Sequence, residues 1–163
     1  MALYYLDASA LVKYYVLEPG STWVRGLVDN PANTISIADA SIAESAAAFA
    51  ILFRTQRISQ RTQEAAFHAM MRHIASHLLK TMPLRTVDFQ LAAHLTQRYL
   101  LKAYDAVQLA VALRYSQFSA AHGLVIAFVS GDNALIKAAK AEGLLTDNPF
   151  EHVLPQDTPR SRA

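Results

Sequence analysis

The stretch Ala2-Leu3-Tyr4-Tyr5-Leu6-Asp7 is a short apolar run that ends at an acidic residue. A run of this length, apolar and rich in Tyr, predicts a strand buried on both faces of a sheet. Leu124-Val125-Ile126-Ala127-Phe128-Val129 has the same character, and Ser130-Gly131-Asp132 follows it. Segments with helical periodicity lie between such runs. This alternation predicts an α/β fold with a parallel sheet covered by helices on both faces.

The other elements are predicted from periodicity and from turn and capping residues. Further strands are expected at 34–37 and 84–87, with a last short strand beginning at Leu144-Leu145. Helices are expected at 7–16, 21–28, 39–53, 88–100, 104–115 and 133–141, together with one that Ser59 caps and Pro83 ends. Helical spacing places several large apolar residues toward the core, namely Phe53, Phe67, Met71, Leu78 and Phe89.

Composition limits the class of protein. The 163 residues are 53% hydrophobic and 17% charged, which is typical of one folded domain, expected over residues 1–154. Residues 155–163 are expected to form a polar C-terminal tail. The chain has no cysteine, which excludes disulfides and suits the cytoplasm. The start of the chain lacks a signal-peptide pattern, and no apolar run approaches the roughly 18 residues of a membrane span, so no membrane association is expected.

Four acidic residues stand beside the most apolar segments of the chain: Asp7, Glu44, Asp105 and Asp132. A carboxylate near a core needs hydrogen bonds or a cation. Asp7 and Asp132 also follow predicted strands, and ligands of parallel sheets bind beyond the carboxyl ends of the strands. Several carboxylates that converge there would be typical of a site for a divalent metal ion.

Each of these residues also has an ordinary structural explanation. Asp is favoured at helix N-caps, and Asp7, Asp105 and Asp132 all stand at or near a predicted helix start. Glu44 lies within a predicted helix, where a solvent-facing position would be enough to explain it. The metal hypothesis accounts for all four residues together, whereas the ordinary explanation needs a separate reason for each.

Four segments of the chain resemble those of a known family. They are Tyr5-Leu6-Asp7-Ala8-Ser9-Ala10-Leu11-Val12-Lys13, Ala43-Glu44, Ala103-Tyr104-Asp105-Ala106-Val107-Gln108-Leu109-Ala110 and Val129-Ser130-Gly131-Asp132. In this order the chain resembles the PIN-domain ribonucleases of the VapC toxin type, which belong to type II toxin–antitoxin systems. The resemblance implies a three-layer α/β/α fold with a short central parallel sheet of about four to five strands.

The resemblance also implies a chemistry. Asp7, Glu44, Asp105 and Asp132 would be the catalytic residues and would bind Mg²⁺, or Mn²⁺ in its place. Ser9 and Ser130 would support the metal site. The activity would be that of an endoribonuclease, which hydrolyses RNA phosphodiester bonds and leaves a 5′-phosphate and a 3′-hydroxyl. Asn133 after Asp132 departs slightly from the family pattern, which usually has a basic residue there.

Partners follow from the same resemblance. Proteins of this type are held by an antitoxin, here a VapB-like protein, whose C-terminal segment covers the active site, and they tend to form homodimers. The substrate would be RNA. Lys13, Lys102 and Arg54 are the candidate contacts to its phosphates, since phosphate binding needs basic side chains.

Three other functions are weighed against this one. A phosphoryl-transfer enzyme of the haloacid-dehalogenase type would use Asp7 as nucleophile, but it would place a second Asp where Ser9 stands. A PIN-domain nuclease could act in RNA processing without an antitoxin. A catalytically silent PIN module would bind RNA or protein without cutting.

Overall fold

The computed structural model describes residues 2–154, and the tail expected at 155–163 lies outside the described residues. Its centre is a five-stranded sheet in which every neighbouring pair of strands is parallel. The strand order is β3-β2-β1-β4-β5. The strands are β1 (Ala2–Leu6), β2 (Asn33–Ala38), β3 (Leu79–Met82), β4 (Ile126–Val129) and β5 (Leu145–Asp147). The prediction of a short parallel sheet is therefore confirmed.

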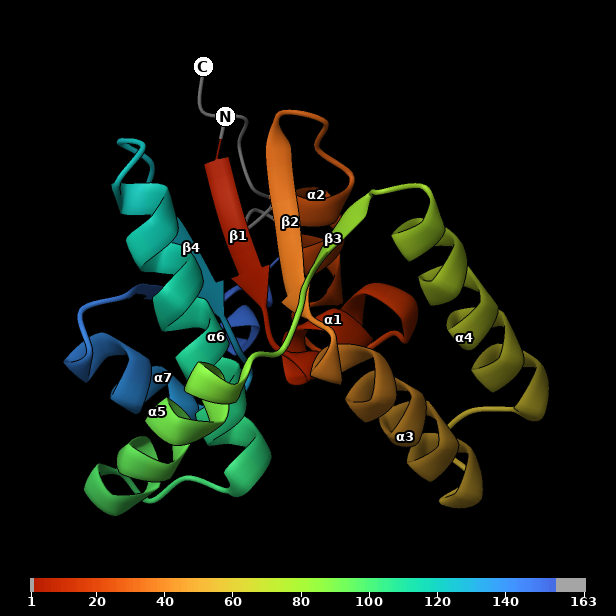
Figure 1. The fold of residues 1–163 in the computed structure, drawn as a ribbon. Helices are drawn as coiled ribbons and strands as arrows, with labels where there is room; N and C mark the ends of the chain where they lie inside the picture. Colours follow the sequence, from red (N-terminus) through yellow and green to blue (C-terminus); the bar gives the residue numbers. More distant parts are fainter. Residues whose placement is uncertain (1, 155–163) are drawn as a thin grey trace.

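Helices cover both faces of the sheet (Figure 1). One layer contains α1 (Ala8–Tyr15), α2 (Ser21–Val28), α3 (Ala40–Arg54) and α4 (Gln60–Ala75). The opposite layer contains α5 (Thr86–Arg98), α6 (Ala103–Ala120) and α7 (Asn133–Ala141), and a 3₁₀ turn, η1 (Pro149–Glu151), follows β5. Within residues 2–154, no helix combines the length and the hydropathy that a membrane crossing requires.

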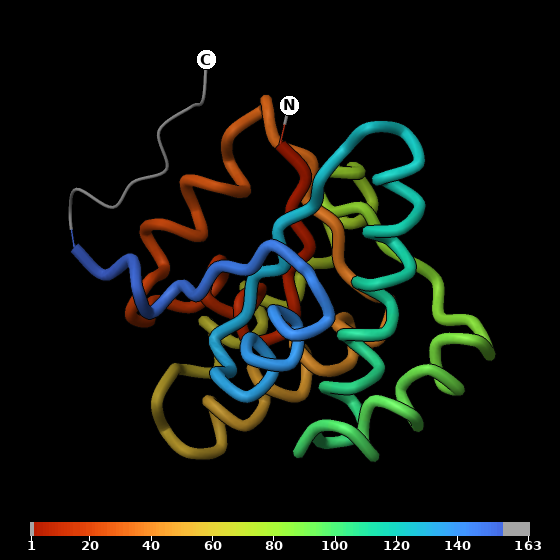
Figure 2. Tube along the Cα trace, turned by 90° about the vertical axis from the view of Figure 1, so that its left-hand side faces the viewer, coloured from red at the N-terminus to blue at the C-terminus, as the bar shows by residue number. Residues whose placement is uncertain are grey.

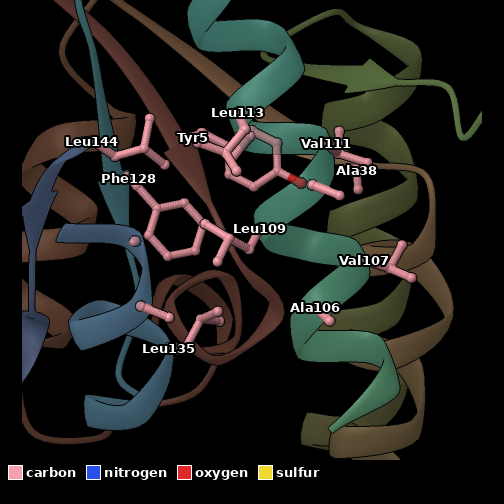
Figure 3. Packing of buried hydrophobic residues seen from close by; sticks show 14 of the residues in the cluster. Tyr5, Ala38, Ala106, Val107, Leu109, Val111, Leu113, Phe128, Leu135 and Leu144 are labelled. Carbon is pink, nitrogen blue, oxygen red and sulfur yellow. The ribbon is translucent and has the colours of Figure 1, made fainter. Parts of the chain in front are cut away.

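Each face of the sheet has its own hydrophobic core, as the alternation of side chains along a strand requires. Tyr5 of β1 points into the core beneath α6, where its ring stacks on that of Phe128 with centroids 5.7 Å apart. Leu109 and Leu113 of α6 cover these rings (Figure 3). Leu6, the next residue along β1, points into the other core. The central strand is thus buried on both faces, which explains why it contains apolar residues only.

The third strand lies before Pro83 and not after it, so the prediction of a strand at 84–87 was wrong. Helix α4 ends at Ala75, and His77 has a positive φ of 60° that turns the chain. Leu79 then pairs with Ile35 of β2. Beyond Pro83, the backbone N–H of Arg85 donates to the Asp88 carboxylate over 2.8 Å and starts α5. Residues 84–87 therefore form a connection and the beginning of a helix.

Several apolar residues that helical spacing assigned to the core face outward instead. Their exposed fractions lie between 38% and 52%, and they are Phe53, Phe67, Met71, Leu78 and Phe89. On α4, only Ala66 and Met70 are buried. Helices α3, α4 and α5 each bury only one side against the rest of the domain, so apolar residues beyond that side remain accessible.

The sheet order determines where a ligand can bind. The chain moves from β1 to β2 on one side of the first strand, whereas β4 pairs on the other side. A crevice beyond the carboxyl ends of the strands is typical of such a switch in direction. The backbone N–H of Asp7 donates to the carbonyl of Val129 over 3.1 Å at this point. Residues 7 and 130–132 therefore leave the sheet side by side.

Candidate active site

Asp7 is the N-cap of α1 and is almost completely buried, with 5% of its surface exposed. Its carboxylate accepts a hydrogen bond from the backbone N–H of Ala10 over 2.9 Å. It also accepts from the hydroxyls of Ser9 at 2.8 Å and Ser130 at 2.7 Å. Asp7 therefore does cap α1, and the hydroxyls of two serines also bind its carboxylate at the edge of a cavity.

The groups that donate to the Asp7 carboxylate are all neutral. Burial raises the pKa of its carboxyl to about 6, the hydrogen bonds from Ala10, Ser130 and Ser9 oppose that rise, and the nearby Glu44 carboxylate adds to it. Neutral donors therefore leave the ionised form of Asp7 incompletely stabilised. A cation placed beside it would stabilise this form.

Glu44, on α3, is half-buried and is held by Gln108 of α6. The Gln108 amide donates to the Glu44 carboxylate and to the Ser41 hydroxyl, the latter at 2.8 Å. Its carbonyl oxygen accepts from the Tyr5 hydroxyl, also at 2.8 Å. Because the ionised Glu44 carboxylate can only accept, the NH₂ group of Gln108 must face it, and the amide oxygen is left to accept from Tyr5. Burial raises the pKa of Glu44, Gln108 lowers it, and Asp105 raises it.

Asp105 and Asp132 complete the predicted set. Asp105 lies in the first turn of α6 and is partly buried. Burial and the neighbouring Asp132 raise its pKa, whereas Lys102 lowers it. Asp132 caps α7 by accepting from the backbone N–H groups of Ala134 at 2.7 Å and Leu135 at 3.0 Å.

All four predicted acids line one cavity of about 430 Å³. Their negative charges affect one another: Glu44 raises the pKa of Asp7, Asp105 raises that of Glu44, and Asp132 raises that of Asp105. The structure thus brings the four residues to one place, although two of them also cap helices. Among residues 2–154, however, no three Asp, Glu or His side chains form a group that is already arranged to hold a metal ion.

The three basic candidates have different positions. Lys13 lines the same cavity, but its side chain is only 2% exposed because its ammonium pairs with Glu18 at 3.2 Å. Lys102 is exposed beside Asp105. Arg54 is exposed at the end of α3, where its Nε donates to the carbonyl of Ala50 over 3.2 Å, and it is not part of the cavity lining.

Three polar or aromatic residues of the cavity received no role from the sequence, namely Gln108, Glu18 and Phe150. Gln108 could have been noticed in the sequence, because it is a polar residue inside the apolar segment 106–113. In the structure it is 2% exposed. Glu18 and Phe150 stand in loop-like sequence and left no comparable signal. Only the folded chain shows that they reach the acidic residues.

The fold is that of PIN-like proteins, with a parallel sheet between two helical layers. Among solved structures, VapC20 from Mycobacterium tuberculosis, described as a sarcin-ricin loop cleaving toxin, matches with a TM-score of 0.60 and 16% identity over 87% of this chain and 96% of its own. FitAcB from Neisseria gonorrhoeae matches with a TM-score of 0.57 and 15% identity over 90% and 98%.

FitAB bound to the IR36 DNA fragment matches with a TM-score of 0.61 and 16% identity, over 90% of this chain and 95% of the other. The sequence matches no protein-family model and no curated protein. At these identities the likeness establishes the fold alone.

Proposed function

We propose that this chain is a Mg²⁺- or Mn²⁺-dependent endoribonuclease and the toxin of a type II toxin–antitoxin system. One observation carries the proposal: Asp7, Glu44, Asp105 and Asp132 come from four separate segments and line one cavity at the carboxyl edge of the sheet. The likeness of the fold to VapC20, a toxin that cleaves the sarcin-ricin loop, supports the same assignment.

The residues of the cavity fit a hard divalent cation by their chemistry. The predicted donors are all carboxylate oxygens, which Mg²⁺ and Mn²⁺ prefer. Burial and mutual repulsion raise the pKa of three of them, which means that their ionised forms are destabilised. A bound cation would stabilise these ionised forms. Asp7 and Asp105 would bind the ion directly, with Glu44 and Asp132 beside them. When bound there, the ion supplies Lewis-acid activation for the displacement at phosphorus.

The other residues of the cavity position these carboxylates. Ser9, Ser130 and the Ala10 N–H fix both oxygens of Asp7. The Gln108 amide orients Glu44, and the Tyr5 hydroxyl in turn orients the amide. Such support limits the movement of the acids before substrate binds, which is how a site is held in a reactive geometry. Hydrolysis would leave a 5′-phosphate and a 3′-hydroxyl.

The partners belong to the same proposal. A VapB-like antitoxin would cover the cavity with its C-terminal segment, and the toxin would act as a homodimer in the cytoplasm. A small DNA-binding protein encoded directly upstream would support this pairing. The same nuclease without such a neighbour would fit a role in RNA processing.

Total RNA cleavage, with mapping of the new ends, tests the activity. The purified chain should cut RNA with Mg²⁺ or Mn²⁺ and should stop in EDTA. Asp7→Asn should abolish cleavage without unfolding the protein. Glu64→Gln is a matched control, since it neutralises an exposed acid on α4 outside the cavity. Unchanged cleavage by pure Asp7→Asn would refute the assignment.

A specific observation favours one second candidate, a silent RNA-binding module. Within the part of the chain that the structure describes, no three acidic or histidine side chains are arranged for a metal ion, and Asp7 and Glu44 already have protein donors. Magnesium titration separates the two functions. A nuclease should gain thermal stability with Mg²⁺ by linkage, whereas a silent module should keep its melting temperature and retain RNA uncut.

A further inference from the structure

The segment after β5 is built into the wall of the acidic cavity. Figure 2 shows this blue segment running beside the orange helix α2. Asn148, which is only 4% exposed, fixes its beginning. The Asn148 amide donates to the side chain of Asn133 over 2.9 Å, and its oxygen accepts from the backbone N–H of Phe150 over 3.0 Å. The backbone of Phe150 is therefore tied to the first residue of α7.

Two further contacts fix the same turn. Gly20 has a positive φ of 85°, and a Cβ at this position would collide with the carbonyl of Pro149. Beyond the turn, the His152 ring stacks on that of Trp23, with centroids 4.2 Å apart and an angle of 6° between the planes. His152 also contacts the Asp147 carboxylate at 2.6 Å. Phe150 thus lies between two anchored points.

The side chain of Phe150 has an unusual environment for a large apolar group. The Lys13 ammonium lies 3.8 Å from the ring centroid and covers one face. The ring edge lies so close to Gly131 that a Cβ there would be 3.1 Å from Cε2. The residue is nevertheless 48% exposed, and it lines the cavity that contains the four acids. An anchored ring with an open face is therefore placed beside the proposed reaction site.

We infer that Phe150 is a substrate-positioning residue whose open face stacks on an unpaired base of single-stranded RNA next to the cleaved bond. The inference rests on the proposed function, which supplies the RNA. Proteins that bind single strands use aromatic rings in this way, because every base has a π-face. The ammonium on the other face draws on the negative potential of the ring and so favours an approaching base.

A purely structural role for Phe150 predicts different behaviour. If the ring only shielded Lys13 from water, a leucine would replace it adequately. If it stacks on a base, only another aromatic side chain would do so. Phe118 is the matched control, since it is 65% exposed and lies 13 residues after Asp105 on α6, about 20 Å along the helix.

The test measures binding of a single-stranded RNA oligonucleotide to the full chain with Ca²⁺ in place of Mg²⁺. Phe150→Ala and Phe150→Leu should each raise the Kd on the order of tenfold. Phe150→Trp and Phe150→Tyr should bind as wild type does, and so should Phe118→Ala. In Phe150→Trp, RNA should quench tryptophan emission beyond the quenching seen for Trp23 in the wild type. An oligonucleotide that is abasic at the stacked position should remove both effects.

Wild-type affinity of Phe150→Leu, or equal losses on abasic and intact RNA, would overturn the inference. Absence of extra quenching in a Phe150→Trp protein that binds RNA would overturn it as well, and so would failure of every variant to bind RNA. Circular dichroism checks that each variant is folded. The nuclease assignment fails separately: a chain that stacks RNA as described but never cuts it with Mg²⁺ would overturn the proposed activity alone.

Discussion

The Ser130 hydroxyl donates to the Asp7 carboxylate over 2.7 Å and joins two residues that are 123 positions apart. Ser130 is fully buried and also accepts from the backbone N–H of Asp132 over 3.0 Å. One hydroxyl therefore links the end of β4 to the first acid of the cavity and to the fourth.

Replacement of this hydroxyl should loosen both acids. Ser130→Ala should lower the free energy of unfolding by about 1–2 kcal/mol, because a buried carboxylate and a backbone N–H lose their partner. RNA cleavage should fall as well. Ser130→Thr keeps the hydroxyl and should retain most of the stability. Urea unfolding of the three proteins checks this, and equal stability of the Ala variant would show that the link is dispensable.

The stability of the metal-free protein should depend on pH through Asp7. Burial raises the pKa of this carboxyl to about 6, so the folded state holds a proton that the unfolded chain has already released. The stability contributed in this way is present below about pH 4 and is lost as pH rises to about 6, by on the order of 3 kcal/mol. Urea unfolding in EDTA across this window measures it. Asp7→Asn should flatten the curve, and an unchanged slope in that variant would assign the effect to another group.

Gln108→Glu should disrupt the cavity more than its small change in size suggests. The new carboxylate would face Glu44, where the amide now donates, and like charges in a partly buried site repel strongly. We expect loss of cleavage and a stability that falls more steeply with rising pH than in wild type, because burial and repulsion raise the pKa of both carboxyls. Gln108→Leu, which removes the donor without adding charge, is the control. If the two variants behave alike, loss of the amide donor is the cause and repulsion between the two carboxylates is not.

Lys13 and Lys102 should differ in the salt dependence of RNA binding. Lys102 is exposed, so Lys102→Met should reduce the slope of log Kd against log salt by about 0.7, the value for one contact to a single strand. Lys13 is buried against Glu18 and Phe150, so Lys13→Met should leave the slope unchanged and lower stability instead. A reduced slope in Lys13→Met would show that its ammonium reaches a phosphate.

Much of this architecture could be predicted because parallel strands have a simple signature. Residues 2–6 and 126–129 are apolar throughout, and their pairing places Asp7 beside residues 130–132. The placement of Asp7 and Asp132 at one edge follows from that topology, whereas Glu44 and Asp105 reach the cavity from helices α3 and α6. The third strand could not be placed, because Leu79-Lys80-Thr81-Met82 mixes polar and apolar residues at the edge of the sheet. There, pairing with β2 and not hydrophobicity decides the structure.

The contacts around Phe150 and Lys13 were beyond sequence reasoning for a different reason. Lys13 was predicted to contact RNA, since a lysine near acidic segments suggests an accessible charge. Its burial depends on Glu18, in the loop after α1, and on a ring 137 positions further along the chain. Such contacts form only when the whole domain has folded, and no local sequence pattern predicts them.

The four acids are distributed from position 7 to position 132, and the aromatic wall of the cavity comes later still, at 150. During synthesis on the ribosome, a growing polypeptide therefore carries an incomplete pocket until residue 150 has emerged. Any premature product that stops before residue 132 lacks both the last carboxylate and the ring. For a protein proposed to destroy RNA, this order of assembly would delay any cutting until the segment after β5 has been made.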